Sequence, residues 1–399
     1  MQVDSLAFAG FVLAVAAGYH LAPARLGPAW LLAASYAFCA TWSWTAAATL
    51  GLSTLATWAI APRVRAGEGV RRPALAAGVA ANLAGLALWK WARAWDPALE
   101  PLAASPAAAL FVPVGISFYA LQAIAYLLDV ARGQLPPERD LVRFALYLAW
   151  FPKLLAGPIE RARPFLAQLA RPAVVDDEAL ARSAALVAVG AVRKTVLADP
   201  LLRMIPAAVF TRPAAAAGHA AWLLAYAVAL YDDVAGYTSI VRGASLLFGL
   251  ELSPNFACPF FARSFTEFWN RWHITLSQYM RDVLFSPLSK FLVRLVGPAH
   301  ANHAIALAIT VVFLLVGVWH GVGWNFAAYG AVHALGVVVN HYYTIGLKKW
   351  LGRDGFKAYN ASAGIRAVAV VLTFCYCAAS LIFFANSFAD IKEIFASLR

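Results

Sequence analysis

The stretch HAIALAITVVFLLVGVW, residues 303–319, contains no Asp, Glu, Lys or Arg and decides which kind of fold to expect. Its length approaches the roughly 20 apolar residues with which a helix crosses the hydrocarbon core of a bilayer. Further apolar stretches lie on both sides of it, at residues 5–22, 29–40, 46–60, 73–91, 107–130, 179–197, 220–230, 234–250, 324–345 and 363–385. We therefore predict an all-α, polytopic membrane protein with about ten or eleven transmembrane helices.

The composition of the whole chain supports this class. Of its 399 residues, 62% are hydrophobic and 13% are charged, whereas soluble domains are about 45–50% apolar and about 25% charged. Its 14 Trp and 14 Tyr suit the aromatic belts of a membrane protein. The composition excludes a soluble enzyme, a disordered chain and a small disulfide scaffold. The four cysteines form no disulfide framework and no zinc-ligand spacing, and we expect them to be small core residues.

The net charge of +12 comes from Lys and Arg that gather between the apolar stretches. Clusters at residues 63–72 and 348–357 follow the positive-inside pattern of membrane proteins rather than a nucleic-acid-binding face, so we expect no nucleic acid. The N-terminus has no basic region before its first apolar stretch, which we therefore expect to be retained as a span. These features predict a multi-pass membrane protein with its N-terminus outside the cytoplasm.

The middle of the chain is less regular. Residues 151–160, FPKLLAGPIE, contain two prolines and a glycine, which disfavour a straight helix and indicate a re-entrant or in-plane element. We find no internal repeat and no inverted pair of broken helices. We therefore predict one membrane domain over residues 1–399.

Residues 265–285, FTEFWNRWHITLSQYMRDVLF, are too polar for a simple span. Glu267 and Arg271 are i,i+4 neighbours in a favourable orientation, and His273 and Ser277 share a neighbouring face. One interpretation is an interfacial helix whose Arg side chains reach the headgroups. The other is a polar helix that lines an internal cavity.

Residues 314–324, LLVGVWHGVGW, place His320 at the end of an apolar helix among Gly317, Gly321 and Gly323. Glycines let backbone or substrate approach closely. A single histidine in an apolar helix is more often structural than catalytic. However, an imidazole is also the side chain best suited to remove a hydroxyl proton near neutral pH.

Two carboxylates, Asp232 and Asp233, precede the apolar stretch 234–250. They are candidates to bind a cation, to orient a histidine, or to cap the following helix, and capping or packing is the commoner outcome. His333 and His341 fall within the stretch 324–345. The chain has no metalloprotease, Walker, dinucleotide or nucleophile-elbow motif, so we expect no metal and no bound cofactor.

Four stretches together resemble the membrane-bound O-acyltransferase family, in the order that the family has them. They are VPVGISFY (112–119), FPKLLAGPIER (151–161), NFACPFFARSFTEFWNRWHITLSQYMRD (255–282) and GVWHGVGW (317–324). The chain is most similar to the bacterial branch that contains the alginate O-acetylation and D-alanyl transfer proteins. Of the two carboxylates, Asp233 is the one that aligns with the pattern of this branch.

The resemblance implies a funnel or tunnel through the bilayer in which an acyl group passes from a thioester to a hydroxyl. It implies that His320, in the W-H-G block, is catalytic and that His273 is the second catalytic position. We expect supporting or substrate-binding roles for the neighbours of these histidines in the motifs and for two further matches, namely Asp233, Glu267, Asn270, Arg271, Trp319, Trp324 and His333.

The donor implied by the resemblance is acyl-coenzyme A, most simply acetyl-coenzyme A, or an acyl carrier protein. The implied acceptor is an exported polysaccharide or envelope glycan, with a periplasmic acetyltransferase as a possible partner. Two alternatives stay open. One is a transporter or flippase without covalent chemistry, and the other is a lipid or protein O-acyltransferase of the same fold.

Overall fold

The structure is a computed structural model that describes residues 1–66, 69–95, 115–171, 175–205 and 216–397. This described part is almost wholly helical, as the apolar stretches predict. It contains one antiparallel pair of two-residue strands, β1 (Arg65–Ala66) and β2 (Gly69–Val70). The chain divides into two compact units: Met1–Lys194 with Ala235–Ser253, and Thr195–Val234 with Pro254–Arg399.

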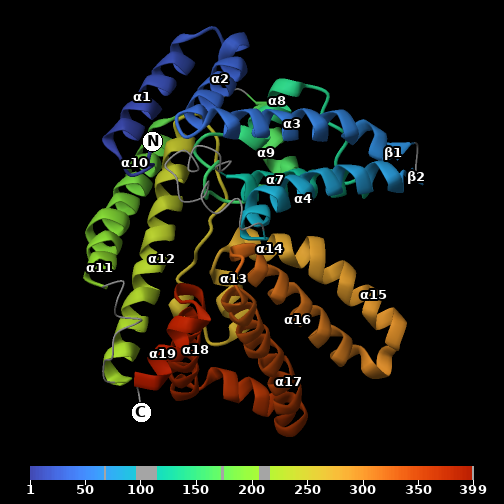
Figure 1. The fold of residues 1–399 in the computed structure, drawn as a ribbon, viewed down its shortest axis with the longest axis vertical. Helices are drawn as coiled ribbons and strands as arrows, with labels where there is room; N and C mark the ends of the chain where they lie inside the picture. The colour runs from blue at the N-terminus through green and yellow to red at the C-terminus, as the bar shows by residue number, and fades with distance from the viewer. Residues whose placement is uncertain (67–68, 96–114, 172–174, 206–215, 398–399) are drawn as a thin grey trace. The chain divides into compact units, whose positions relative to one another are not determined.

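The first unit is built from helices that follow the predicted apolar stretches closely. Figure 1 shows α3 and α4 running side by side to the β1–β2 pair. Part of the predicted stretch 107–130, and of the motif 112–119, lies outside the described residues. The elements of this unit before α12 are α1 (Leu6–Leu21), η1 (Ala24–Leu26), α2 (Gly27–Ala40), α3 (Trp44–Val64), α4 (Arg72–Trp95), α7 (Ile116–Ala131), α8 (Leu141–Ala149), α9 (Ala162–Leu169), α10 (Asp177–Ala191) and the beginning of η3 (Val192–Ala198), up to Lys194.

Short polar side chains set the beginnings of several of these helices. Ser5 Oγ accepts a hydrogen bond from the Phe8 N–H at 3.1 Å before α1, and Asp176 accepts one from the Ala179 N–H at 2.8 Å before α10. Such caps satisfy backbone donors that the first helical turn leaves unpaired.

The predicted break at residues 151–160 is confirmed, because residues 151–156 form turns and not a helix. Trp150, just before the turn, and Phe151, its first residue, anchor the turn in the core. Their rings lie 5.3 and 5.9 Å from that of Phe248, and Trp150 Nε1–H donates to Ser245 Oγ at 2.9 Å. The non-helical backbone is therefore held by buried aromatic packing.

The second unit contains the segments in which most of the candidate site residues lie. In Figure 1, α15 and α16 lie side by side. The elements are α11 (Asp199–Met204), α12 (Ala216–Leu246, its residues to 234), η5 (Pro259–Phe261), α13 (Phe265–Arg271), α14 (Ile274–Tyr279), η6 (Met280–Phe285), α15 (Ser286–Val296), η7 (Pro298–His300), α16 (Ala301–His320), α17 (Trp324–Ala361), α18 (Ala363–Ala385) and α19 (Phe388–Ser397).

Glycines allow α16 and α17 to approach closely. A Cβ added to Gly317 would lie 2.2 Å from the carbonyl oxygen of Phe326, and one added to Gly330 would lie 2.4 Å from that of Phe313. Both distances are well below van der Waals contact. This crossing explains one of the glycines that the sequence places around His320.

Two predicted boundaries are wrong. The stretch 220–230 and most of the stretch 234–250 form one continuous helix, α12, which ends at Leu246, because the Tyr231–Val234 segment between the two stretches has no glycine or proline to end it. The stretch 324–345 continues to Ala361 in α17, with a kink at Gly352 (φ 65°). The expectation for the cysteines holds for Cys39 and Cys377, which are buried, and fails for the other two, which are exposed.

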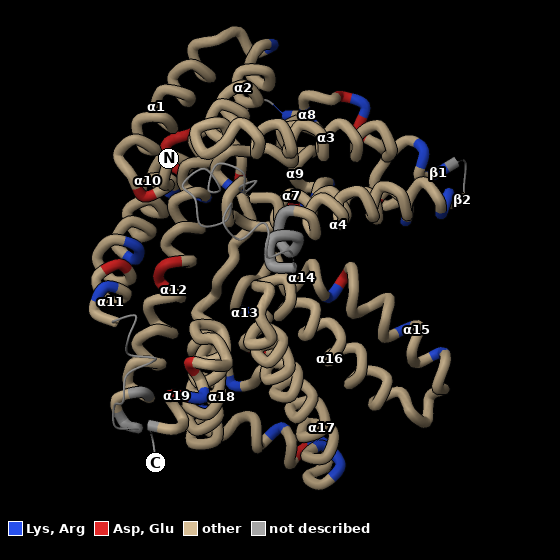
Figure 2. Tube along the Cα trace, in the orientation of Figure 1, with Lys and Arg blue, Asp and Glu red and all other residues tan. Residues whose placement is uncertain are grey.

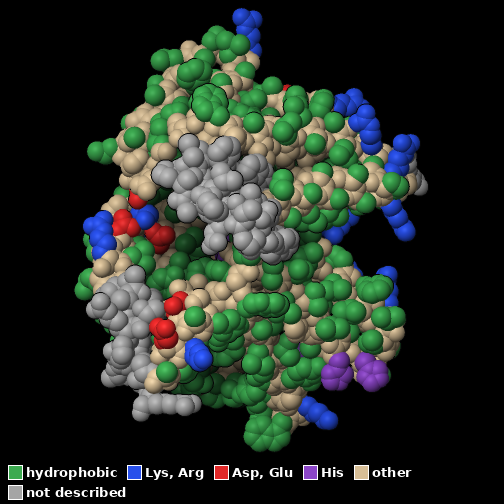
Figure 3. All heavy atoms as spheres, viewed as in Figure 1, with side chains coloured by type: hydrophobic (Ala, Val, Ile, Leu, Met, Phe, Trp, Pro, Cys, Tyr) green, Lys and Arg blue, Asp and Glu red, His purple; other side chains and the backbone are tan. Residues whose placement is uncertain are grey.

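Within the described residues, two helical stretches are long and apolar enough to cross a bilayer by length and composition, Pro298–His320 and Ala363–Ala385. The predicted number of about ten or eleven spans therefore stays a prediction. Figure 2 shows Lys and Arg near the β1–β2 end of α3 and α4 and near one end of α17. Figure 3 shows hydrophobic side chains over much of the visible face.

Candidate active site

The first feature of the candidate site is the charged start of α13. Ser264 Oγ caps the helix by accepting the Glu267 N–H at 3.1 Å. The Glu267 carboxylate accepts from Arg271 at 2.7 Å, which confirms the predicted pair, and from the Arg263 Nε–H at 3.1 Å. Burial alone would raise the pKa of Glu267, but the hydrogen bonds from Arg263 and Arg271 outweigh it and lower that pKa below its usual value.

His273 lies between two short helices, α13 and α14, where the helical backbone is interrupted. α13 ends at Arg271, and His273 has φ 45° and ψ 54°, a left-handed conformation that is uncommon outside glycine. Asn255, which lies in a segment that is neither helix nor strand, fixes the backbone at this point by accepting three hydrogen bonds. Its carbonyl oxygen accepts the Ile274 N–H at 2.9 Å, and its Oδ1 accepts the N–H and hydroxyl of Thr275 at 3.1 and 2.8 Å.

The surroundings of His273 are apolar. Its ring centroid lies 6.4 Å from that of Phe256, which in turn packs on Trp272 at 5.2 Å. Burial lowers the pKa of His273, because a low-dielectric environment disfavours the imidazolium. At neutral pH this side chain is therefore a neutral imidazole.

His320 is the last residue of α16, so its imidazole lies at the point where the helix ends. Its ring lies 4.8 Å from Trp319, 6.0 Å from Tyr329 and 5.3 Å from Phe384. The next residue must be small, since a Cβ on Gly321 would lie 2.0 Å from the ring of Phe326. His320 thus sits half-buried in an aromatic enclosure at a glycine-rich turn.

His333 joins the same aromatic group from α17. Its ring lies 4.5 Å from Tyr329 and 5.0 Å from Trp269, and its Nε2 is 2.9 Å from Ser380 Oγ. Tyr329 therefore contacts both His320 and His333. His273 belongs to the neighbouring aromatic group, which reaches His333 through the stacked rings of Trp272 and Phe268.

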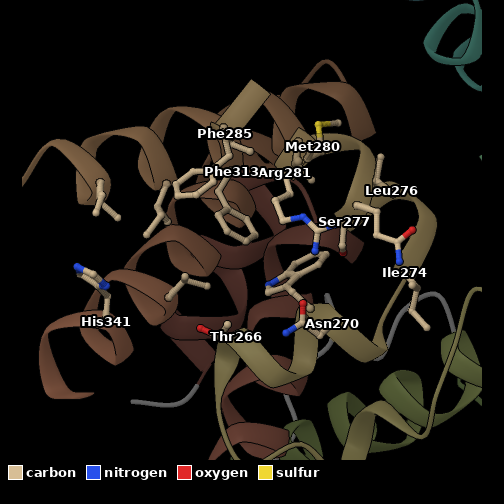
Figure 4. A pocket seen from close by; sticks show the side chains of 17 residues that line it. Thr266, Asn270, Ile274, Leu276, Ser277, Met280, Arg281, Phe285, Phe313 and His341 are labelled. Atoms are coloured by element: carbon tan, nitrogen blue, oxygen red, sulfur yellow. The ribbon is translucent and has the colours of Figure 1, made fainter. Parts of the chain in front are cut away.

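A cavity of about 340 Å³ lies against this group (Figure 4). Asn270, Ser277 and Arg281 supply polar groups to a lining that is otherwise mostly apolar and includes Trp269 and Phe313. Figure 4 shows Arg281 and Ser277 near one end of the cavity and His341 toward the other. Of the two interpretations of residues 265–285, this geometry favours the polar segment that lines a cavity.

A second cavity, of about 560 Å³, shares the lining residues Thr266 and His341 with the first. Its wall carries three cationic side chains, from Arg263, Lys348 and Arg366. Arg263 is paired with Glu267, whereas Lys348 and Arg366 have no ion-pair partner within the described part of the chain. The larger cavity is therefore suited to an anionic ligand.

The structure corrects one expectation for each of two predicted site residues. Asp233 is inside α12, which excludes capping of a new helix, and the neighbouring Tyr231 contacts Phe260 at 5.0 Å. Trp324 begins α17 with its side chain 81% exposed, because the turn after His320 directs it away from the aromatic enclosure. Sequence spacing had placed Trp324 in the histidine block, but the structure does not.

Sequence reasoning missed Tyr329, Ser380 and Trp269. Ser380 lies 47 residues from His333, so no local spacing signals their contact. Trp269 stands within the quoted F-W-N-R-W-H block, and its aromatic character was the available signal. Tyr329 follows the W-H-G turn by little more than two helical turns, on the face of α17 that contacts α16.

The first unit holds a buried polar cluster that the sequence analysis also missed. Lys153, with 0% exposure, donates to Gln122 Oε1 and to the carbonyl oxygen of Tyr147 at 2.6 Å. Glu160, with 3% exposure, accepts the Ser253 N–H at 2.6 Å and the Ser253 hydroxyl at 3.0 Å. Burial lowers the pKa of Lys153. These contacts hold the FPKLLAGPIER segment in place.

Comparisons with known proteins agree with the motifs. The family model for the membrane-bound O-acyltransferases matches residues 131–382. The probable alginate O-acetylase AlgI of Azotobacter vinelandii is 34% identical over 327 residues, which cover 79% of this chain and 63% of the relative. The chain thus matches less than two thirds of the length of that relative.

Two further relatives differ in the acceptor that their names give. The peptidoglycan O-acetyltransferase of Helicobacter pylori is 29% identical over 269 residues, 60% of this chain and 50% of the relative. The teichoic acid D-alanyltransferase of Streptococcus thermophilus is 27% identical over 294 residues, 70% of this chain and 69% of the relative. The acyl group and the acceptor thus vary among the relatives.

Proposed function

Because the chain belongs to the membrane-bound O-acyltransferase family, we propose that it moves an acyl group from a cytoplasmic thioester to a hydroxyl of an exported polysaccharide or envelope glycan. The acyl group is most simply acetyl. The observation that carries this proposal is the position of His320, at a helix end in an aromatic enclosure with a second histidine beyond Tyr329. Such an enclosure favours proton transfer away from bulk water.

In the proposed step, His320 accepts the proton of the acceptor hydroxyl, directly or through a relay. The oxygen forms a bond to the thioester carbonyl carbon, the carbon–sulfur bond breaks, and the proton passes to the departing thiolate. His273 orients the reactants or stabilises the oxyanion, and its neutral form suits a hydrogen-bond donor. Asn270, Arg271, Glu267 and Trp319 support these two histidines.

The larger cavity supports the position of the donor. Two cations in its wall, Lys348 and Arg366, match the phosphates of coenzyme A or the acidic surface of a carrier protein. Lys348 belongs to the basic cluster that charge distribution predicts to be cytoplasmic. The smaller cavity shares the lining residues Thr266 and His341 with it and reaches Trp269, whose ring lies 5.0 Å from that of His333.

The acceptor side follows from the names of the relatives, which act on alginate, peptidoglycan and teichoic acid. We propose an envelope or exported glycan as the acceptor, reached directly or through a periplasmic acetyltransferase partner. In this arrangement the chain acts as one domain of the bacterial inner membrane, with its N-terminus outside the cytoplasm.

The decisive experiment replaces His320 by Ala in protein reconstituted into nanodiscs. We expect His320→Ala to abolish transfer of labelled acetyl groups from acetyl-coenzyme A, or from an acetylated carrier protein, while the melting temperature stays close to that of the wild type. His300→Ala is the matched control, because His300 is exposed at the other end of the same helical stretch. Full activity of His320→Ala would refute the assignment.

A further inference from the structure

A buried hydrogen-bond chain fixes the tautomer of His333. Ser380 Oγ lies 2.6 Å from the carbonyl oxygen of Cys377 and 2.9 Å from His333 Nε2. A serine hydroxyl has one hydrogen, and two lone pairs facing each other at 2.6 Å would repel, so this hydrogen is donated to Cys377. Ser380 Oγ must then accept from His333. Nε2 therefore carries the ring hydrogen, and Nδ1 is a hydrogen-bond acceptor.

Two polar atoms beside this series of hydrogen bonds are complementary, one an acceptor and the other a donor. His333 Nδ1, an acceptor, and Trp269 Nε1–H, a donor, are both buried, and neither has a hydrogen-bond partner among the residues that the structure describes. The two side chains are 2% and 9% exposed, and their rings meet edge to face with centroids 5.0 Å apart. A buried polar group left unpaired costs about 1–3 kcal/mol, so this pair points to a ligand.

The chemistry of the two atoms defines that ligand. A hydroxyl group donates its hydrogen to an imine nitrogen and accepts an indole N–H through its oxygen. A carboxylate would satisfy only the indole, and an ammonium group only the imidazole. The walls around the two atoms are aromatic, including Phe268 and Phe313, so a neutral group is favoured over a charged one.

We propose that His333 and Trp269 form a hydroxyl-binding subsite that holds a non-reacting hydroxyl of the acceptor, with Ser380 as the positioning residue that sets the tautomer of His333. This inference rests on the proposed function. Trp269 lines the smaller cavity, which gives the subsite an approach. Tyr329 contacts both His333 and His320, so a hydroxyl bound here lies beside the reaction centre. The subsite thus favours an acceptor with at least two hydroxyls, such as a sugar.

Matched variants test the two contacts separately. Trp269→Phe removes the indole N–H and keeps an aromatic ring. At position 333, Asn places an amide group where Nδ1 stands, whereas Gln places one where Nε2 stands. We measure KM and kcat for acetyl transfer from acetyl-coenzyme A to an alginate oligosaccharide, together with hydrolysis of acetyl-coenzyme A without acceptor.

We expect Trp269→Phe and His333→Gln each to raise the acceptor KM about tenfold, a larger change than that of kcat or of hydrolysis without acceptor. His333→Asn should raise KM less than His333→Gln does. Ser380→Ala should also raise KM, and Ser380→Thr should restore it. An unchanged KM in Trp269→Phe, or equal values for Asn and Gln at position 333, would overturn the subsite and leave a water molecule as its occupant.

Nitrogen-15 NMR of the wild-type protein with labelled histidine tests the tautomer without any activity. We expect a histidine with a protonated Nε2 and an unprotonated Nδ1, and we assign it to His333 because its signals are absent from the spectrum of His333→Gln. In the wild type, the Nδ1 signal of this histidine should shift when the oligosaccharide is added. A protonated Nδ1 at this residue would refute the inference. Failure of the proposed function is a distinct result, because the wild type would then transfer no acetyl group to any hydroxyl.

Discussion

The ion pairs of Glu267 with Arg263 and Arg271 at the start of α13 give a prediction whose magnitude follows from their geometry. Glu267 is 21% exposed and accepts hydrogen bonds from Arg271 and Arg263, which are 33% and 50% exposed. Buried charge-assisted hydrogen bonds contribute about 1.5–3 kcal/mol, but exposed ion pairs contribute only about 0.2–1 kcal/mol. A carboxylate in the first helical turn adds about 0.5 kcal/mol. We expect Glu267→Gln to lower the free energy of unfolding by about 1–2 kcal/mol.

The assay is the apparent melting temperature in detergent, measured as a function of pH. A change of 1 kcal/mol shifts a domain of 150–250 residues by about 2–4 °C, and larger proteins by less, so the expected drop at pH 7 is about 1–4 °C. The pKa of Glu267 is lower in the folded protein than its ordinary value of 4.5. The stabilisation is therefore fully present above that value and is lost as the pH falls through the folded-state pKa.

The difference between wild type and Glu267→Gln should accordingly shrink in the most acidic buffers. Asp282→Asn is the matched control, because Asp282 forms an ion pair with Arg281 in which both side chains are more than 40% exposed. It should change the melting temperature by less than about 1 °C. Two results would contradict this reasoning: equal melting temperatures of Glu267→Gln and the wild type at pH 7, or a difference in melting temperature that is as large at acid pH as at pH 7. Either would show that the charge of Glu267 does not stabilise the protein.

Two further predictions concern the helix crossing and the donor cavity. Gly317→Ala should destabilise the protein by about 1–3 kcal/mol, because the added Cβ would lie 2.2 Å from the carbonyl oxygen of Phe326. Gly346→Ala is the control, because a Cβ added there meets no other atom within 4 Å among the described residues, and it should be neutral or stabilising in the same thermal melt. Lys348→Glu should raise the KM for acetyl-coenzyme A several-fold at low salt and less at high salt, while Lys349→Glu, which does not line the cavity, should not; equal effects of the two reversals would contradict a specific donor contact.

Local patterns in the sequence predicted the features that depend on near neighbours. The stretch 363–385 coincides with α18 because Ser362 caps its start and the apolar residues run without a break. The Glu267–Arg271 pair followed from i,i+4 spacing, and the turn at residues 151–156 followed from its prolines and glycine. Each of these features is decided within about one or two helical turns of chain.

The features that sequence reasoning missed depend on contacts between distant segments. Ser380 sets the tautomer of His333 from a different helix, and Glu160 meets Ser253 across 93 residues. The polar pair Asp232 and Asp233 was misplaced for a related reason. A carboxylate in an apolar context resembles a helix cap, and only the continuity of α12 shows that both lie inside one helix.

The backbone at His273 combines the two kinds of information. Its left-handed conformation would suit glycine or asparagine better than histidine, and a residue of this kind costs about 1–2 kcal/mol when it is held there. No propensity argument from the sequence predicts it, since the cost is met by the hydrogen bonds that Asn255 makes to Ile274 and Thr275. A strained histidine that tertiary contacts hold in place, beside the ring group that reaches His333, is better explained by a requirement for its imidazole than by any need of the fold.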